Sequence, residues 1–289
     1  MRVLVTGAAG QVGSEITSEL ERLSAERPRD PIDVIAADRS RLDVADRDQV
    51  LSAICHLEPD LVIHVAAWTA VDECEADPDR ALSVNALGTR HVADAARRAK
   101  AHLVYLSTDY VFDGTSPRPY VEWDQPNPLS VYGRSKLGGE LELDSGSTVV
   151  RTAWVVGKTG SNMAKTVLRL GRAEGGRPLR FVEDQRGSPT VASDLAAKVV
   201  DLGLARRPGC FHVTNQGETT WFGFARAVMT FAGLDAGRVE SIKTAELEPA
   251  RAAARPANSV LDNAALRLSG DDLLPEWQES VERLVRELG

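Results

Sequence analysis

The apolar positions in the first half of the chain follow two alternating patterns. Short continuous apolar runs predict strands at residues 2–6, 31–38, 61–65, 102–106 and 149–151. Apolar positions at helical spacing predict helices at residues 12–23, 46–57 and 78–100. Because strands and helices alternate along the chain, the pattern favours parallel strands joined by helices in a doubly wound α/β sheet.

The pattern becomes less regular after about residue 152. Helices are expected at residues 163–172, 192–204, 220–231 and 276–288, with short strands between them, whereas residues 250–259 read as a loop. We therefore expect an α/β fold in two parts. Residues 1–155 form a Rossmann-type doubly wound parallel sheet, to which a later strand and helix return near 191–215. Residues 156–289 mainly form a smaller mixed α/β lobe that binds the substrate.

The composition is that of an ordinary globular protein, with 43% hydrophobic and 26% charged residues in 289. The net charge of −8 argues against non-specific binding to nucleic acid or anionic lipid, so a small molecule is the expected partner. No apolar stretch of about 18 residues and no signal-peptide pattern appears, so we expect a cytoplasmic protein. The three cysteines and five histidines show neither disulfide nor zinc spacing, which favours ordinary core or surface roles.

A glycine turn, TGAAGQVG, follows the first predicted strand. Gly7, Gly10 and Gly13 recur at three-residue spacing, which permits a tight turn, a close approach of phosphate to the backbone, and close helix–strand packing. A merely tight turn gives the same pattern by chance, but its place between a strand and a helix favours a dinucleotide site. Asp38, at the end of the second strand, can bind the adenosine ribose diol, and Arg39 can bind a 2′-phosphate. Both NADH and NADPH therefore remain open.

The stretch VYGRSK holds a tyrosine and a lysine four residues apart. On a helix, Tyr132 and Lys136 would share one face, which taken alone is typical of a surface pair. However, the strand at 102–106 ends in Ser107 and Thr108, at the edge where open α/β sheets bind ligands. A strand-end hydroxyl, a tyrosine and a lysine suit the reduction of a carbonyl group. Tyr132 would be the acid, Lys136 would lower its pKa and hold the nicotinamide ribose, and Thr108 would bind the reacting oxygen.

These features together resemble the extended short-chain dehydrogenase/reductases, which share T-G-x-x-G-x-x-G, a strand-end Ser or Thr, and Y-x-x-x-K. Within them, the chain resembles the dTDP-4-dehydrorhamnose reductase family, and the resemblance covers essentially the whole chain. The matching stretches are GQVG (10–13), AAWTAVDECE (66–75), STDYVFDG (107–114), VYGRSKLGGE (131–140), RTAWVV (151–156), NMAKTVLRL (162–170), EDQRGSPT (183–190), TTW (219–221), ARPANS (254–259) and LPEW (274–277).

The resemblance implies NAD(P)H-dependent reduction of the 4-keto group of dTDP-6-deoxy-L-lyxo-4-hexulose to dTDP-L-rhamnose. It places Thr108, Tyr132 and Lys136 on the catalytic positions of the family. The implied cofactor-binding residues are Gly7, Gly10, Gln11, Val12, Gly13, Asp38, Arg39, Ala66, Ala67, Tyr132 and Lys136.

The substrate side of the site is implied by a second group of residues. Asp109 and Trp154 match sugar-contacting positions, as Thr108 does; Trp154 could be a core aromatic, but its place just after a strand favours the site. Asn162, Lys165 and Arg255 could hold the diphosphate or could equally be solvated surface residues.

One departure from the family concerns a metal. Some members form a dimer through a magnesium ion bound by three glutamates, and Glu15 and Glu287 match two of those positions. Ser193 stands at the third, and a neutral serine is a poor replacement for a carboxylate around a hard cation. We therefore expect no metal, and a monomer or a weak homodimer.

Two alternatives belong to other classes of function. A non-catalytic dinucleotide-binding subunit, such as the regulatory subunit of methionine adenosyltransferase, has the same fold, but the intact Thr108, Tyr132 and Lys136 weigh against it. A sugar-nucleotide dehydratase or epimerase is the other alternative. Dehydratases place an Asp-Glu pair after the strand-end threonine, whereas Asp109 is followed by Tyr110 here. A reductase of another nucleotide-linked 4-keto-deoxysugar also remains open.

Overall fold

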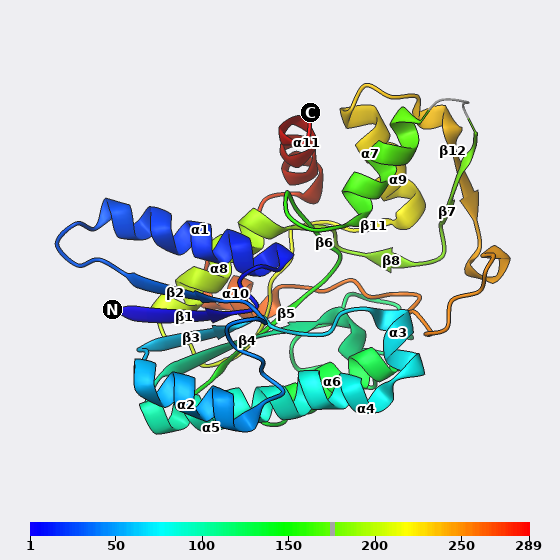
Figure 1. Ribbon diagram of the computed structural model, residues 1–289. Coiled ribbons are helices and arrows are strands. Elements are labelled where there is room, and N and C mark those ends of the chain that lie inside the picture. The colour runs from blue at the N-terminus through cyan, green and yellow to red at the C-terminus, as the bar shows by residue number, and fades with distance from the viewer. Residues whose placement is uncertain (174–176) are drawn as a thin grey trace.

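The computed structural model describes residues 1–173 and 177–289 and is built around a six-stranded parallel sheet (Figure 1). The strands lie in the order β10-β5-β4-β3-β1-β2. Their bounds are β1 Arg2–Thr6, β2 Asp33–Ala37, β3 Leu61–His64, β4 His102–Thr108, β5 Thr148–Thr152 and β10 Gly209–His212. The doubly wound α/β sheet expected from the sequence is thus confirmed, and its strands begin and end within about three residues of the expected positions.

Helices cover both faces of this sheet (Figure 1). Helix α1 packs beside α8 on one face, and α2 packs beside α5 on the other. Their bounds are α1 Gln11–Glu26, α2 Arg47–Leu57, α5 Gly88–Ala99 and α8 Ala192–Leu204. Although α8 and β10 follow much later in the chain, they complete the sheet layer, because β10 pairs in parallel with β5.

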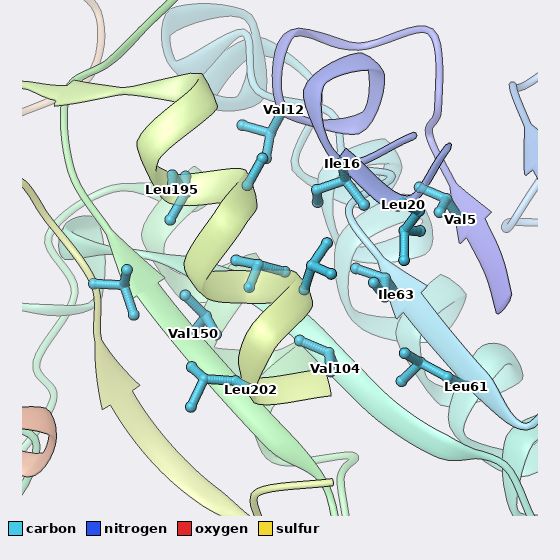
Figure 2. Packing of buried hydrophobic residues seen from close by; sticks show 14 of the residues in the cluster. Val5, Val12, Ile16, Leu20, Leu61, Ile63, Val104, Val150, Leu195 and Leu202 are labelled. Carbon is cyan, nitrogen blue, oxygen red and sulfur yellow. The ribbon is translucent and has the colours of Figure 1, made fainter. Parts of the chain in front are cut away.

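The core on the α1–α8 side is made of branched aliphatic side chains from both layers (Figure 2). Ile16 and Leu20 of α1 and Leu195 of α8 are fully buried against strand residues such as Ile63 and Val104. Strands buried on both faces are expected to read as continuous apolar runs, which is why β1, β3 and β4 were visible in the sequence.

The helix expected at residues 78–100 begins at Pro78 and ends at Ala99, but a π-helical segment, Ser83–Leu87, interrupts it between α4 (Pro78–Leu82) and α5. Asn85 lies in this segment and is buried. Its side chain accepts a hydrogen bond from the backbone N–H of Trp68 at 2.8 Å and donates to Ser135 Oγ at 2.9 Å. The segment therefore joins the loop after β3 to the helix that carries Tyr132 and Lys136.

A smaller lobe lies beyond the sheet (Figure 1). Its own core is formed mainly from α7, α9 and α11. The remaining helices are α3 Val71–Ala76, α6 Val131–Glu140, α7 Met163–Arg172, α9 Trp221–Phe231, α10 Ala264–Ser269 and α11 Trp277–Glu287. The short strands are β6 Val155–Val156, β7 Leu179–Val182, β8 Arg186–Gly187, β9 Thr190–Val191, β11 Thr219–Thr220 and β12 Val239–Ile242. They pair as β6 with β9, β7 with β12 and β8 with β11.

None of the helices in the described ranges is long and apolar enough to cross a membrane.

Candidate active site

One cavity of about 770 Å³ lies at the carboxyl edge of the sheet and extends to the lobe. The glycine turn forms one side of it, and the ends of β3, β4 and β5 form its floor. All of the residues expected to bind the cofactor line it, as do Thr108, Asp109 and Trp154. Segments that lie far apart in the sequence therefore contribute to a single site.

The glycine turn lies so close to the segment that follows β3 that Gly7 has no room for a side chain. Gly7 has a φ of +70°, and a Cβ there would lie 2.7 Å from the Cα of Ala66. A Cβ on Gly13 would lie 2.8 Å from the Cα of Ala8. Helix α1 begins directly after this turn, and its N-cap, Gly10, provides no side-chain hydrogen bond. The N–H groups of the first turn are therefore available to an anion such as a pyrophosphate.

We expect Gly7→Ala to lose both stability and cofactor binding. The new methyl group would overlap the backbone of Ala66 and force a left-handed conformation on a residue with a Cβ. Overpacking of this kind lowers the free energy of unfolding by about 1–3 kcal/mol. Chemical denaturation and titration with NADPH measure the two effects.

Gly146→Ala is the matched control, because Gly146 is exposed and the nearest atom to its added Cβ is 3.4 Å away. This variant should bind NADPH as the wild type does. Equal losses of stability and NADPH affinity in both variants would show that the close backbone approach at Gly7 is not their cause.

Asp38 and Arg39 directly follow β2 and line the cavity at the end of this strand. Asp38 Oδ1 accepts hydrogen bonds from the hydroxyl of Ser40 at 2.6 Å and from its N–H at 2.9 Å, and the hydroxyl bond is the main cause that lowers the pKa of Asp38. The side chain of Arg39 is 73% exposed and lies 3.5 Å from Asp43, so it can turn toward a ligand. An ionised carboxylate and a solvated guanidinium are thus both present at this end.

Helix α6 presents the tyrosine–lysine pair to the cavity, not to solvent. Ser130 caps the helix, accepting a hydrogen bond from the N–H of Gly133 at 3.1 Å. Tyr132 is 9% exposed and Lys136 only 2%. Lys136 Nζ donates to the carbonyl oxygen of Leu106 at 2.7 Å and lies 4.1 Å from the ring centre of Tyr105. The alternative of a solvated surface pair is therefore wrong.

Burial dominates the protonation of this pair. Burial raises the pKa of Tyr132 above its ordinary range, while the nearby hydroxyl of Thr108 opposes the shift. Burial lowers the pKa of Lys136 to about 7, opposed by Glu140. The expected depression of the tyrosine pKa by Lys136 is not found; burial is the largest influence on Tyr132 and raises its pKa. A raised pKa keeps the Tyr132 hydroxyl protonated, which is the state that an acid requires.

Asp109 is the most deeply buried carboxyl group of the site, with 2% exposure. Its Oδ1 accepts a hydrogen bond from the Thr108 hydroxyl at 3.0 Å, whereas Oδ2 has no hydrogen-bond partner among residues 1–173 and 177–289. Burial raises the pKa of Asp109 to about 6, and the side chains of Ser259 and Thr108 partly oppose it.

We expect Asp109→Asn to be more stable than the wild type at neutral pH. The pKa of Asp109 is higher in the folded protein than the ordinary 3.8, so the folded state binds more protons between these values. The contribution of Asp109 to stability should therefore decrease as the pH rises from about 4 to about 6, so the wild type should lose stability relative to the amide variant over this range. At about 1.4 kcal/mol per pH unit, the difference at pH 7 is on the order of 2–3 kcal/mol, measured by urea unfolding.

The control variant is Asp113→Asn, which should be less stable than the wild type at neutral pH. The pKa of Asp113 is lowered, chiefly by the backbone N–H of Thr115, so its contribution to stability is present at neutral pH and disappears in acid. Destabilisation by both substitutions at pH 7 would contradict the assignment of a raised pKa to Asp109.

Two tryptophans form the wall of the cavity on the side of the lobe. The rings of Trp154 and Trp221 stack with their centres 3.6 Å apart and an angle of 5° between them. Trp154 has a φ of +46°. Gly187 makes room for its indole, since a Cβ there would overlap the ring. Trp154 lines the cavity, as its place after a strand predicts, so the alternative of a purely core aromatic is not supported; its contact with a sugar stays a prediction.

Asn162, Lys165 and Arg255 are not among the described residues that line the cavity. Asn162 Nδ2 donates to Gln11 Oε1 at 2.9 Å, and Lys165 Nζ donates to the carbonyl oxygen of Gly160 at 3.0 Å. Arg255 forms a two-pronged ion pair with Asp72, with distances of 2.5 and 2.7 Å. The structure therefore does not bring these three side chains to the cavity, and their binding of a diphosphate stays a prediction.

Several residues that line the cavity were not predicted from the sequence. Trp221 lies in the stretch TTW that carried the family resemblance, but the pattern did not show where its ring points. Trp68 and Tyr110 also line the cavity, and Arg80 lies 4.3 Å from the ring centre of Trp68. Their directions depend on the loops after β3 and β4.

The described residues contain no group of three or more His, Cys, Asp or Glu side chains placed to hold a metal ion. Glu287 pairs with Lys158 at 3.2 Å, and Ser193 is exposed on α8.

Comparison with known proteins connects this site to named enzymes. The family model described as RmlD substrate binding domain matches residues 1–289. A dTDP-4-dehydrorhamnose reductase of Streptomyces griseus is 41% identical, with 97% of this chain and 91% of that protein covered. A dTDP-4-keto-6-deoxy-D-glucose reductase of Streptomyces niveus is 38% identical, with 97% and 93% covered. The crystal structure of dTDP-4-dehydrorhamnose reductase from Bacillus anthracis in complex with NADP superimposes with a TM-score of 0.92 at 38% identity, covering 99% of both chains.

Proposed function

The chain belongs to the family of the RmlD substrate binding domain, and we propose that it is a dTDP-4-dehydrorhamnose reductase. It reduces the 4-keto group of dTDP-6-deoxy-L-lyxo-4-hexulose to give dTDP-L-rhamnose. The observation that carries this proposal is the single cavity into which the glycine turn, the strand-end Thr108 and the pair on α6 all open.

The reaction needs a hydride and a proton at the carbonyl group. The reduced nicotinamide, NADPH or NADH, supplies the hydride when it is bound. Tyr132 gives its proton to the carbonyl oxygen, and its raised pKa keeps the proton available until charge develops there. Thr108 donates a hydrogen bond to the same oxygen. Lys136 Nζ, which bonds the carbonyl oxygen of Leu106, has further donors to hold the nicotinamide ribose.

The two parts of the chain bind different ligands. Residues 1–155, with the strand and helix near 191–215, hold the cofactor through the glycine turn, Asp38 and the Ala66–Ala67 strand end. Residues 156–289 mainly cover the sugar nucleotide. Trp154 supplies an apolar face for the deoxysugar, and the stack with Trp221 supports its position. Asp109 also lines the cavity, next to the hydroxyl of Thr108.

The proposal is tested by following the oxidation of NADPH and NADH with substrate made in situ by a 3,5-epimerase from dTDP-4-keto-6-deoxyglucose. Oxidation that requires the epimerase supports the proposal. Equal oxidation without it would favour a reductase of dTDP-4-keto-6-deoxyglucose, the substrate named for the Streptomyces niveus relative. If NADPH binds but is never oxidised, the non-catalytic subunit becomes the better account.

We expect Arg39→Ala to raise the KM for NADPH by roughly tenfold or more and to leave the KM for NADH nearly unchanged. Arg39 is an exposed cation at the adenosine end of the cavity, and a hydrogen bond to a charged group is worth about 1.5–3 kcal/mol. The KM values for NADPH and NADH, measured separately, show which cofactor the enzyme prefers.

Arg41→Ala removes the same charge nearby, but Arg41 contacts the carbonyl oxygen of Ala36 and is not among the described cavity-lining residues. It should change neither KM. An equal effect of both substitutions would point to general electrostatics, with no direct contact to a 2′-phosphate.

We also propose a monomer or weak homodimer located in the cytoplasm, where nucleotide sugars and reduced nicotinamide are available. Ser193 supplies no carboxylate, and Glu287 is already paired with Lys158. Light scattering with and without magnesium should give the same mass.

A further inference from the structure

The hydroxyl group of Thr108 has one hydrogen and two lone pairs, and its neighbours compete for them. Its Oγ1 accepts a hydrogen bond from the N–H of Tyr110 at 3.3 Å and lies 3.0 Å from Asp109 Oδ1. An ionised Asp109 can only accept, so it takes the single hydrogen of Thr108. In that state Thr108 has no hydrogen left for a carbonyl oxygen in the cavity.

Protonation of Asp109 reverses the direction of this hydrogen bond. The neutral carboxyl group donates to Thr108, whose two lone pairs are then used by Asp109 and by the N–H of Tyr110. The hydrogen of Thr108 is left for the oxygen of the substrate. This is the direction that the proposed role of Thr108 requires.

We propose that Asp109 works as a neutral carboxylic acid and is a positioning residue, which donates to Thr108 and thereby turns the Thr108 hydrogen toward the sugar carbonyl. This inference rests on the proposed reductase function and deepens it. The proton of Asp109 is not consumed, because the proton that reaches the alkoxide comes from Tyr132. Asp109 therefore needs no reloading between turnovers.

The surroundings of Asp109 support the neutral form. The side chain is almost fully buried, and Oδ2 has no hydrogen-bond partner in the described part of the chain. The nearby Ser259 hydroxyl, which partly opposes the raised pKa, donates its hydrogen to the carbonyl oxygen of Arg186 at 3.3 Å. The titratable and charged groups that face it are Tyr132 on α6, Tyr110 on the same turn, and Arg255, which interacts with Tyr110 from the loop at 250–259. Arg255 is held by Asp72. A carboxylate in this position would leave one oxygen desolvated and unsatisfied.

The test is the pH dependence of kcat, at saturating substrate and cofactor, for the wild type, Asp109→Asn and Asp109→Ala. The wild-type rate should fall as Asp109 ionises, above a pKa of about 6. The fall should be absent in Asp109→Asn, because an amide N–H donates to Thr108 at every pH. Asp109→Ala, which has no donor, should be slower than Asp109→Asn by roughly tenfold, since one directed hydrogen bond is lost. The same falling limb in Asp109→Asn, or equal rates in both variants, would overturn the proposal.

A double-mutant cycle separates action through Thr108 from a merely structural role. In a Thr108→Val background the hydroxyl is gone, so Asp109→Asn should no longer alter the pH profile. An effect of unchanged size in that background contradicts the proposal. Binding of NADPH and the thermal melting curve show that each variant is folded.

An infrared measurement tests the inference even if the proposed substrate is wrong. The carboxyl band of a neutral aspartic acid should be present at about pH 5, where an ordinary aspartate is ionised, and absent from Asp109→Asn. Absence of this band from the wild type would overturn the inference without bearing on the reductase function. Failure of the wild type to turn over any nucleotide-linked keto-sugar would instead overturn the proposed function.

Discussion

Replacement of Tyr132 by phenylalanine should reduce kcat by about 10²–10⁴-fold, the range that a positioned acid contributes. The hydroxyl lies in a buried position on the cavity wall, and burial keeps it protonated. The phenylalanine ring fills the same space, so stability and the affinity for NADPH should change little. Rates under saturating substrate, with NADPH titrations alongside, measure these effects.

The matched control is Tyr110→Phe. Tyr110 lines the same cavity, and its ring meets that of Tyr132 edge-on at 5.6 Å between centres. Its hydroxyl is not assigned to the reaction, so a much smaller decrease in kcat is expected. A decrease of less than tenfold for Tyr132→Phe, or equal decreases for both variants, would mean that the proton comes from another group.

Replacement of Glu140 by alanine should lower the free energy of unfolding by about 3–5 kcal/mol, the largest effect on stability expected in this chain. Glu140 pairs with Arg151 through contacts of 2.6 and 2.9 Å, and both side chains are less than a tenth exposed. Glu140 also accepts a hydrogen bond from Ser107 at 2.5 Å. Its loss leaves an uncompensated buried guanidinium and loosens α6 from the ends of β4 and β5. Urea unfolding measures the change.

Two further variants distinguish the loss of a buried charge partner from the loss of side-chain packing. The double variant Glu140→Met with Arg151→Met removes both charges and should recover most of the lost stability, since a buried pair can be replaced by apolar residues at little net cost. Glu282→Ala removes the exposed pair with Arg286 and should change stability by less than about 1 kcal/mol. A double variant as unstable as Glu140→Ala would show that the shape of these side chains matters more than their charge.

The fold could be predicted from the sequence because its signals are local. Buried parallel strands read as apolar runs, and the glycine turn and the tyrosine–lysine spacing each lie within one segment. Their meeting at one cavity follows from the rule that parallel strands end at the same edge of a sheet. For the same reason the strand-end Thr108 could be placed at this edge without the structure.

Other features depend on contacts between distant segments and could not be predicted. The π-helical segment at Asn85 exists because this side chain bonds both the loop after β3 and α6. Trp221 reaches the cavity by stacking on Trp154, which lies 67 residues earlier in the chain. For Arg255 the sequence leaves both a diphosphate contact and a solvated surface position open, whereas in the structure it pairs with Asp72, a partner that no local pattern indicates.

The burial of Asp109 is a similar case. In the sequence Asp109 follows Thr108, and the resemblance to the family implies that it contacts the sugar, but nothing there indicates how deeply it is buried. In the structure the 3₁₀ turn Asp109–Val111 directs it inward, where one of its oxygens finds no donor among the described residues.

We propose that this site transfers a hydride to the 4-keto carbon of a dTDP-linked deoxyhexulose while Tyr132 supplies the proton. The most direct measurement uses NADPH carrying deuterium at the transferred position, with dTDP-4-dehydrorhamnose as substrate, and locates the label in the product by mass spectrometry and NMR. We expect the wild type to form dTDP-rhamnose with one deuterium at C4, and Tyr132→Phe to form almost none. Bound NADPH without labelled product, or a label at another carbon, would contradict it.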